Sequence, residues 1–315
     1  SPTSRKRSPR SRFCLLGCVA RQRDLSTEKH VVACFEVLQR DLLLIFYGYT
    51  NYKLEFHDNI CSMKFSDYID SHHVFTTSSL LKVMDSAAAA EEQLRRAVRS
   101  GAVERVRRGL LVSNHRRFED APVEQTEVVT VLDACAVVSY HSALEAHGVA
   151  HNAGFVCRFR SDVVRSGFDF RGIAYRPCGP VGNAKSKTMR SPAGTYLATT
   201  REQTVVDCLG KPALAGGVEE TVRGLTAFVY LNVEELVGLA IDAGPSMASR
   251  VGWLLSEKKA EWHVSEESLS LLEGRLGPGP YRLGSASVGS AGWAARWRLV
   301  LPEDKEEVVS WITRS

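Results

Sequence analysis

Residues 74–112 constrain the fold of this chain most, because they place two short helices and a basic hairpin one after another. Thr76 and Thr77 can accept hydrogen bonds from the free backbone N–H groups of a helix that begins near Ser78 and stops near Asp85. No Glu or Gln follows at the position that would close a capping box. The apolar face of this first helix carries Leu80, Leu81 and Met84.

A second helix follows, which Asp85 or Ser86 would cap and Gly101 would end. Its acidic residues come early and its arginines come late, an order that suits the helix dipole. The charged residues in question are Glu91 and Glu92, then Arg95, Arg96 and Arg99, and the apolar stripe is Leu94, Ala97 and Val98.

The hairpin has Val103 and Val106 facing inward, a tip at Arg107-Arg108-Gly109 and a return strand over 110–112. With a further helix starting near Met63, this is the element order of a winged helix-turn-helix, whose second helix enters the DNA major groove. The alternative is a solvated basic helix beside an ordinary hairpin. The residues expected to face bases are Gln93, Arg95, Arg96 and Arg99, and those expected to contact phosphates are Arg105, Arg107 and Arg108.

The composition supports a globular protein of two or three domains, since 44% of the 315 residues are hydrophobic and 24% are charged. A net charge of +4 means that a nucleic-acid surface would be a local patch. The most apolar stretch, 31–49, is interrupted by Glu36, Arg40 and Asp41, so we expect no membrane span and a cytoplasmic location.

The eight cysteines make no paired CxxC frame and are typical of reduced thiols in a cytosol. The alternative is a zinc site from Cys14, Cys18, Cys34 and His30, whose spacing is irregular.

Four regions follow from these patterns. They are a poorly patterned N-terminal extension over 1–62, a DNA-binding domain over 63–114, a polar linker over 115–125 and an α+β domain over 126–315. Residues 1–12 are rich in Ser, Pro and Arg, which predicts disorder.

The last region mixes separated strands and helices, which favours α+β over regular β-α-β alternation. We expect strands at 155–160, 168–175, 195–198, 281–283 and 296–301, and a mobile basic loop at 181–192. We expect helices at 124–134, from a Ser139 cap to Gly148, at 202–209, 218–228, 233–243, 247–259 and 265–272. Thr200 with Gln203 and Asn232 with Glu235 have capping-box spacing.

Several groups could carry chemistry, and each has a plainer explanation. His141 and Glu145, with His147 nearby, have metal-ligand spacing, yet a packed or solvated His is the default. Asp242 with Glu257-Lys258-Lys259 imitates a nuclease pattern, although Glu257 ends a helix.

Glu202 and Asp207 could form an acid pair, but residues five apart do not share a helix face. Cys208 has no readable His partner, and buried Cys is common. The basic residues Lys185, Lys187 and Arg190 could bind phosphate or RNA, or be only solvated. Phosphate loops, GxGxxG and GxSxG are missing from the sequence, which predicts no cofactor. Trp253, Trp297 and Trp293 are expected to pack in the core, with one left to line a surface site.

Six strings in order carry a family resemblance: FTTSSLL, LRRAVRSGAVERVRRGLLV, YHSALEAHGVA, LATTREQTVVDCLGKPALAGGVEE, SRVGWLLSE and RWRLVLP. From Met63 to the C-terminus the chain resembles the AbiEi family of antitoxins of type IV toxin–antitoxin (abortive-infection) systems. It departs from that family in its N-terminal extension and in the run of alanines at 87–90.

The resemblance implies a DNA-binding repressor of its own promoter and an antitoxin against a co-encoded nucleotidyltransferase-like toxin, without a stable complex. It places base recognition on Gln93, Arg95, Arg96 and Arg99, and the wing on Arg105, Arg107, Arg108 and Gly109. It supplies no catalytic residue, metal or cofactor, so we expect a protein that is not an enzyme. The alternatives are a C-terminal nuclease or modifying enzyme, or a regulator that senses a small ligand.

Overall fold

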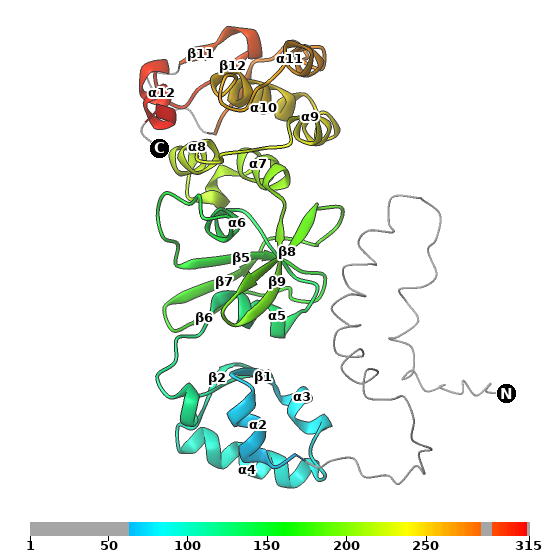
Figure 1. Ribbon diagram of the computed structural model, residues 1–315, viewed down its shortest axis with the longest axis vertical. Coiled ribbons are helices and arrows are strands. Elements are labelled where there is room, and N and C mark those ends of the chain that lie inside the picture. The colour runs from blue at the N-terminus through cyan, green and yellow to red at the C-terminus, as the bar shows by residue number, and fades with distance from the viewer. Residues whose placement is uncertain (1–62, 285–291, 314–315) are drawn as a thin grey trace, which may run out of the picture. The chain divides into compact units, whose positions relative to one another are not determined.

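The computed structural model describes residues 63–284 and 292–313, and this part of the chain is a mixed α+β protein (Figure 1). The fold class expected from the sequence is confirmed at this level. Within these two ranges, no helix combines the length and apolar character that a membrane crossing requires. Three expectations fall outside the described residues: the disordered tail at 1–12, the rest of the N-terminal extension, and a zinc site at Cys14, Cys18, Cys34 and His30.

The first described segment runs helix, strand, helix, helix, hairpin. Its elements are α2 (Phe65–Ser71), β1 (Val74–Thr76), α3 (Thr77–Lys82), α4 (Ala87–Arg99), β2 (Val103–Arg107) and β3 (Leu110–Ser113). The helices and the hairpin match the sequence-based prediction, and β1 is an addition to it. Both pairings are antiparallel, and the strand order is β1-β3-β2.

Side-chain caps set where α3 and α4 begin. The Thr76 hydroxyl accepts from the Ser79 backbone N–H at 3.0 Å, and the Ser79 hydroxyl accepts from the Thr76 N–H at 3.1 Å. A serine therefore closes the capping box for which the sequence offers no Glu or Gln, and α3 starts at Thr77 rather than near Ser78. Ser86 caps α4 by accepting from the Ala89 N–H at 3.3 Å.

Strand β3 is buried on both faces, which explains its uninterrupted apolar sequence. Its alternate side chains point to opposite sides of the sheet and enter two cores. One core holds Leu110 and Val112 with Val128, Val129 and Phe159; the other holds Leu111 with Phe75, Leu80 and Leu94. Because Val128 and Val129 belong to α5 (Gln125–Leu132), the predicted linker at 115–125 joins two regions that share one core.

A six-stranded mixed sheet follows, in the order β6-β7-β5-β4-β9-β8. Its strands are β4 (Val137–Val138), β5 (Val156–Arg160), β6 (Phe168–Phe170), β7 (Ile173–Pro177), β8 (Ser186–Ser191) and β9 (Gly194–Thr199). The single strand expected at 168–175 is a hairpin instead, because Arg171 and Gly172 both adopt positive φ and reverse the chain.

Two further expectations are corrected here. Residues 181–192 are not simply a loop, since β8 pairs with β9 along its whole length. The cap of α6 (His141–Ala146) is Tyr140, at φ 56° and ψ −132°, and not Ser139. The Ser139 hydroxyl instead donates to the Val137 carbonyl at 2.9 Å.

The remaining helices are α7 (Arg201–Gly210), α8 (Val218–Thr226), α9 (Val233–Asp242), α10 (Pro245–Glu257), α11 (Glu266–Glu273) and α12 (Lys305–Thr313). The caps that the sequence places at Thr200, Asn232 and Ser265 are confirmed. Their side-chain oxygens accept from backbone N–H groups three residues later, at 3.2, 3.1 and 3.1 Å. Helix α12 was not foreseen from the sequence.

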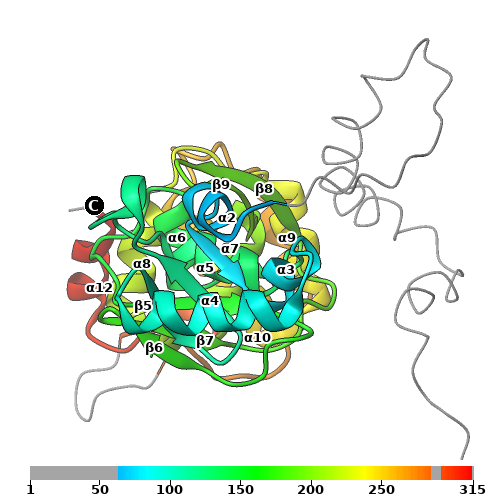
Figure 2. The same ribbon diagram turned by 90° about the horizontal axis from the view of Figure 1, so that it is seen from below.

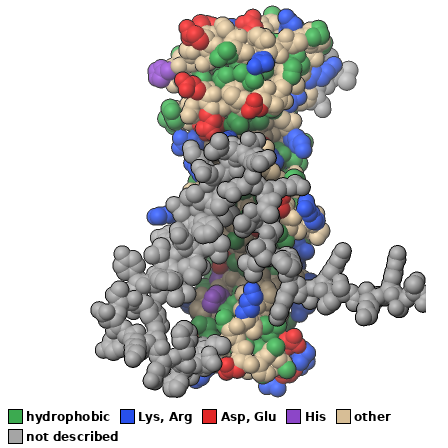
Figure 3. Space-filling view, turned by 90° about the vertical axis from the view of Figure 1, so that its right-hand side faces the viewer, with side chains coloured by type: hydrophobic (Ala, Val, Ile, Leu, Met, Phe, Trp, Pro, Cys, Tyr) green, Lys and Arg blue, Asp and Glu red, His purple; other side chains and the backbone are tan. Residues whose placement is uncertain are grey.

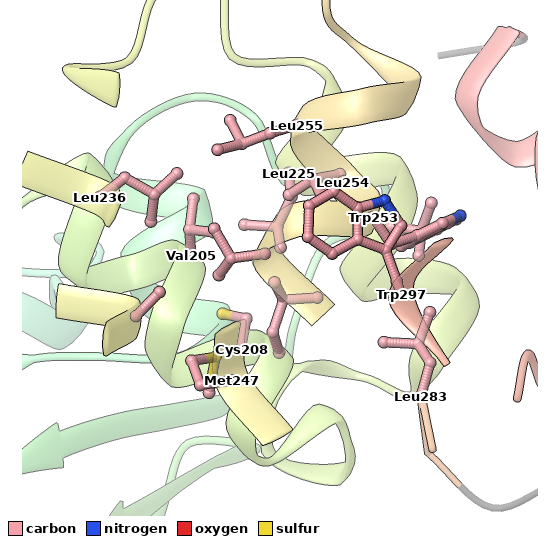
Figure 4. Close-up of a cluster of buried hydrophobic side chains, with 14 of the residues drawn as sticks. Val205, Cys208, Leu225, Leu236, Met247, Trp253, Leu254, Leu255, Leu283 and Trp297 are labelled. Carbon is pink, nitrogen blue, oxygen red and sulfur yellow. The ribbon is translucent and has the colours of Figure 1, made fainter. Parts of the chain in front are cut away.

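These helices enclose the largest core, part of which is drawn in Figure 4. Trp253 and Trp297 are buried in it, as expected, whereas Trp293 is 49% exposed. The strand expected at 296–301 is broken because Arg298 has a positive φ after a short 3-10 turn. What remains is a small sheet of β10 (Tyr281–Arg282), β12 (Leu299–Val300) and β11 (Trp293–Ala294).

Candidate nucleic-acid interface

Helix α4 presents a polar face to solvent, and Figure 2 looks onto this helix. Ala90, Leu94 and Ala97 form its buried stripe, as the helical period requires. The side chains that lie off this stripe and are exposed include all four expected to read bases, Gln93, Arg95, Arg96 and Arg99.

Two of these arginines share one acidic partner. Arg95 Nε donates to Glu92 Oε2 at 3.0 Å, and Arg96 Nε donates to Glu92 Oε1 at 3.1 Å. These hydrogen bonds lower the pKa of the Glu92 carboxyl. The Arg95 and Arg96 side chains remain 58% and 72% exposed, so neither is withdrawn from solvent. Surface pairs of this kind contribute little and are readily exchanged for another anion.

The three arginines of the hairpin differ in their exposure to solvent. Arg105 and Arg108 are exposed, and among the described residues neither forms an ion pair. Arg107 is half-buried, with its guanidinium 5.1 Å from the centre of the Phe168 ring and Nη1 donating to the Ser166 carbonyl at 3.4 Å. No sequence pattern could reveal that contact, because the partner lies on a distant strand.

Strand β2 is also held by a charged contact. Arg171 donates to Glu104 at 2.6 Å and to the Asn114 side-chain oxygen at 2.8 Å. This contact ties the hairpin to the β6–β7 turn and fixes the base of the strand that carries Arg105.

Basic and acidic side chains are interspersed on the face shown in Figure 3, over the part of the surface that is not grey. This distribution agrees with the small net charge of +4. Any nucleic-acid interface on this face would depend on local groups of arginines.

His141, one of the candidate metal ligands, lies buried between two carboxylates. Its Nε2 is 3.4 Å from Glu220 Oε1 and its Nδ1 is 3.8 Å from Glu145 Oε2. The same carboxylates accept backbone N–H groups of the loop at 151–154, with Glu220 bound by Asn152 at 3.0 Å and Glu145 by Gly154 at 2.7 Å. The nearby Glu145 carboxylate raises the pKa of His141 against the opposing effect of burial.

This arrangement serves the loop rather than a metal. His147, which lies nearby in the sequence, contacts the Thr199 carbonyl at 2.9 Å. Within 63–284 and 292–313, no cluster of His, Cys, Asp and Glu side chains is arranged to hold a metal ion.

The raised pKa of His141 predicts a pH-dependent stability. The protonated form is favoured in the folded state, so this contribution is complete below the ordinary His pKa and is lost as the pH rises through the folded pKa. His141→Gln should therefore lower the free energy of unfolding more at pH 5.5 than at pH 8.5, as measured by urea titration. His151→Gln, at an exposed position in the same loop, is the control. Equal losses at both pH values would contradict the assignment.

Asp207 is paired with Arg160 and not with Glu202. Arg160 Nη2 donates to Asp207 Oδ1 at 2.7 Å, and Gln203 Nε2 donates to the same oxygen at 2.9 Å. Asp207 Oδ2 and Arg160 Nε are buried and have no hydrogen-bond partner within the described part of the chain. Burial raises the pKa of Asp207, and Arg160 opposes that rise.

The remaining candidates serve the fold in similar ways. Glu202 accepts the Asn232 backbone N–H at 2.8 Å. Burial raises the pKa of the Cys208 thiol well above its usual range, which makes it a poor nucleophile. The buried Lys258 pairs with Glu261 and the exposed Lys259 pairs with Glu266, so both lysines of the nuclease-like pattern are held in ion pairs.

The described part thus defines a mixed α+β protein with an exposed basic helix beside a basic hairpin. Its fold is similar to the crystal structure of the RV2827C protein from Mycobacterium tuberculosis, with a TM-score of 0.55 and 16% sequence identity. The match covers 84% of this chain and 96% of that one. At such low identity the similarity establishes the fold alone. No protein-family model and no curated protein matched the chain.

Proposed function

We propose that residues 63–114 form a winged helix-turn-helix domain that binds duplex DNA. The supporting observation is the order helix, strand, helix, helix, hairpin around the sheet β1-β3-β2, with the arginine face of α4 open to solvent. In this proposal α4 enters the major groove and Arg105 and Arg108 of the hairpin contact phosphates. Arg107 can contact a phosphate only if its guanidinium moves away from the Phe168 ring.

The first turn of α4 limits base recognition. Residues 87–90 are four alanines, which offer no hydrogen bonds to base edges. Direct readout then rests on Gln93, Arg95, Arg96 and Arg99, and phosphate contacts supply much of the affinity.

We further propose that the protein represses its own promoter and acts as the antitoxin of a type IV toxin–antitoxin system. The sequence resemblance supports this proposal, and its strings include YHSALEAHGVA, which spans α6, and LATTREQTVVDCLGKPALAGGVEE, which runs from β9 into α8. The proposal assigns the protein no enzymatic activity and places it in the cytoplasm. It requires a nucleotidyltransferase-like reading frame beside this gene, whose product forms no stable complex with this chain.

Single arginine replacements test the DNA interface. Arg96→Ala and Arg108→Ala should each weaken binding to the duplex upstream of the gene. Arg108→Ala, which removes a phosphate contact, should also reduce the slope of log affinity against log salt concentration by about 0.9. Gel shifts at several salt concentrations measure both quantities.

Arg275→Ala is the matched control, because it removes one exposed positive charge beyond α11. It should leave duplex binding unchanged. If both interface variants bind the duplex as tightly as the wild type does, α4 and the hairpin are not the DNA surface.

A further inference from the structure

The connection between α8 and α9 exposes two large apolar side chains in succession. Val229 is 93% exposed and Tyr230 is 64% exposed, whereas Phe228 and Leu231 on either side are buried. The Tyr230 ring therefore lies outside the core and is accessible to solvent.

The backbone of this connection is held at both ends. Trp262 Nε1 donates to the Phe228 carbonyl at 2.8 Å, and the Asn232 N–H donates to Glu202 Oε1 at 2.8 Å. Figure 1 shows the connection passing beside α7, which carries Glu202. The exposure of Tyr230 thus belongs to an anchored segment and not to a loose one.

Basic side chains gather at the start of α7. Lys185 and Arg201 are exposed. The Thr200 N–H donates to the Lys185 carbonyl at 2.9 Å, which brings the backbone of Lys185 next to the start of α7. Burial lowers the pKa of Lys187, and the nearby charge of Arg201 lowers it further. Among the described residues, none of these three side chains forms an ion pair.

Two contacts bring the segment that carries Tyr230 next to the start of α7. Glu202, next to Arg201, binds the backbone two residues after Tyr230. The centre of the His147 ring lies 5.6 Å from that of Phe228, two residues before Tyr230. Burial lowers the pKa of His147, and the nearby charges of Lys187 and Arg201 lower it further. Glu202 is buried and accepts the Asn232 N–H, and its charge offsets only part of the effect that Arg201 has on the pKa of Lys187. Glu234 and Glu235, in the first turn of α9, follow Tyr230 by four and five residues along the chain.

We propose that Tyr230, Lys185, Lys187 and Arg201 form a binding surface for single-stranded nucleic acid. Such surfaces combine cations that follow the phosphate backbone with an aromatic ring on which an unpaired base stacks. A duplex keeps its base faces covered and could not use the ring in this way. The surface is separate from α4 and the hairpin and does not depend on the function proposed for them.

Fluorescence anisotropy with labelled 12-nucleotide single strands of mixed sequence, one of RNA and one of DNA, tests the proposal on the full chain. Tyr230→Ala should weaken binding at least about fivefold, the effect expected for loss of one stacked base. Tyr230→Phe should retain wild-type affinity, because the ring and not the hydroxyl makes the contact. A preference between the two strands would identify the sugar of the natural ligand.

Arg201→Ala should weaken binding and lower the salt slope by about 0.7, the value for one phosphate contact on a single strand. Leu271→Ala and Arg275→Ala are matched controls, since each removes an exposed apolar or basic side chain from α11 or its C-terminal end. Both controls should bind like the wild type.

The proposal is overturned if the wild type binds neither strand, or if Tyr230→Ala binds as tightly as the wild type. It is also overturned if polyglutamate binds with the same dependence on Arg201 and none on Tyr230, which would assign the surface to an acidic polypeptide. Arg96→Ala should leave single-strand binding intact. A failure of duplex binding alone would therefore reject the function proposed for residues 63–114 and leave this surface standing.

Discussion

Gly252→Ala should lower the free energy of unfolding by about 3 kcal/mol, the upper part of the range for overpacked cores. A Cβ at Gly252 of α10 would overlap three atoms of the Trp297 ring. The ring cannot easily move aside, because its Nε1 donates to the Ser256 hydroxyl at 2.9 Å and the Trp297 carbonyl accepts from Ser249 at 2.7 Å. Urea titration of the variant and the wild type measures the difference.

Gly238→Ala is the matched control. Gly238 also lies within a helix, α9, but a Cβ there would meet no atom within 4 Å. Alanine should stabilise the protein by about 0.5–1 kcal/mol, because glycine loses more backbone freedom on folding. A Gly252→Ala variant as stable as the wild type would show that α10 and Trp297 do not pack as described.

Asp207→Ala should cost about 3–5 kcal/mol, the usual loss when one partner of a buried ion pair is removed. The Asp207 and Arg160 side chains are only 6% and 18% exposed, so the remaining guanidinium would have little water to replace its partner. Replacing both residues, as Arg160→Met with Asp207→Leu, should recover much of the stability. Denaturant titration of the single and double variants provides the comparison, and a double variant no more stable than Asp207→Ala would contradict this view of the pair.

The same variants separate a structural carboxylate from a catalytic one. If the protein is the antitoxin proposed above and Asp207 serves only the fold, the double variant should neutralise the toxin as well as the wild type does. If the C-terminal region were a nuclease or modifying enzyme that uses Asp207, the double variant would fold and fail to protect. Growth of cells that express toxin and variant together distinguishes the two outcomes.

Local chemistry made much of the fold predictable. The helix starts at Thr200, Asn232 and Ser265 follow from a side-chain oxygen and a backbone N–H three residues apart, which a sequence shows directly. The apolar stripe of α4 likewise follows from its period. Strand pairing was less accessible, because β8 is recognisable only beside β9 and its own residues are polar and basic.

For the candidate surfaces too, the sequence predicts local features but not contacts between distant segments. The exposed arginines of α4 could be placed from helical spacing, whereas the contact between Arg107 and Phe168 depends on a fold that brings β2 beside β6. The sequence did not predict that Tyr230 would be exposed, because a tyrosine between Phe228 and Leu231 resembles core sequence. Its exposure arises from the way Glu202 and Trp262 hold the flanking backbone.

The two-faced burial of β3 has a consequence for anyone who dissects this protein. A fragment that stopped at residue 114 would leave Val106, Leu110 and Val112 facing water, and one that started at 126 would leave Val128 bare in the same way. Pieces with such faces tend to aggregate. The smallest fragment that preserves the α4 surface therefore extends through α5 and the six-stranded sheet, because the core below β3 is built from all three.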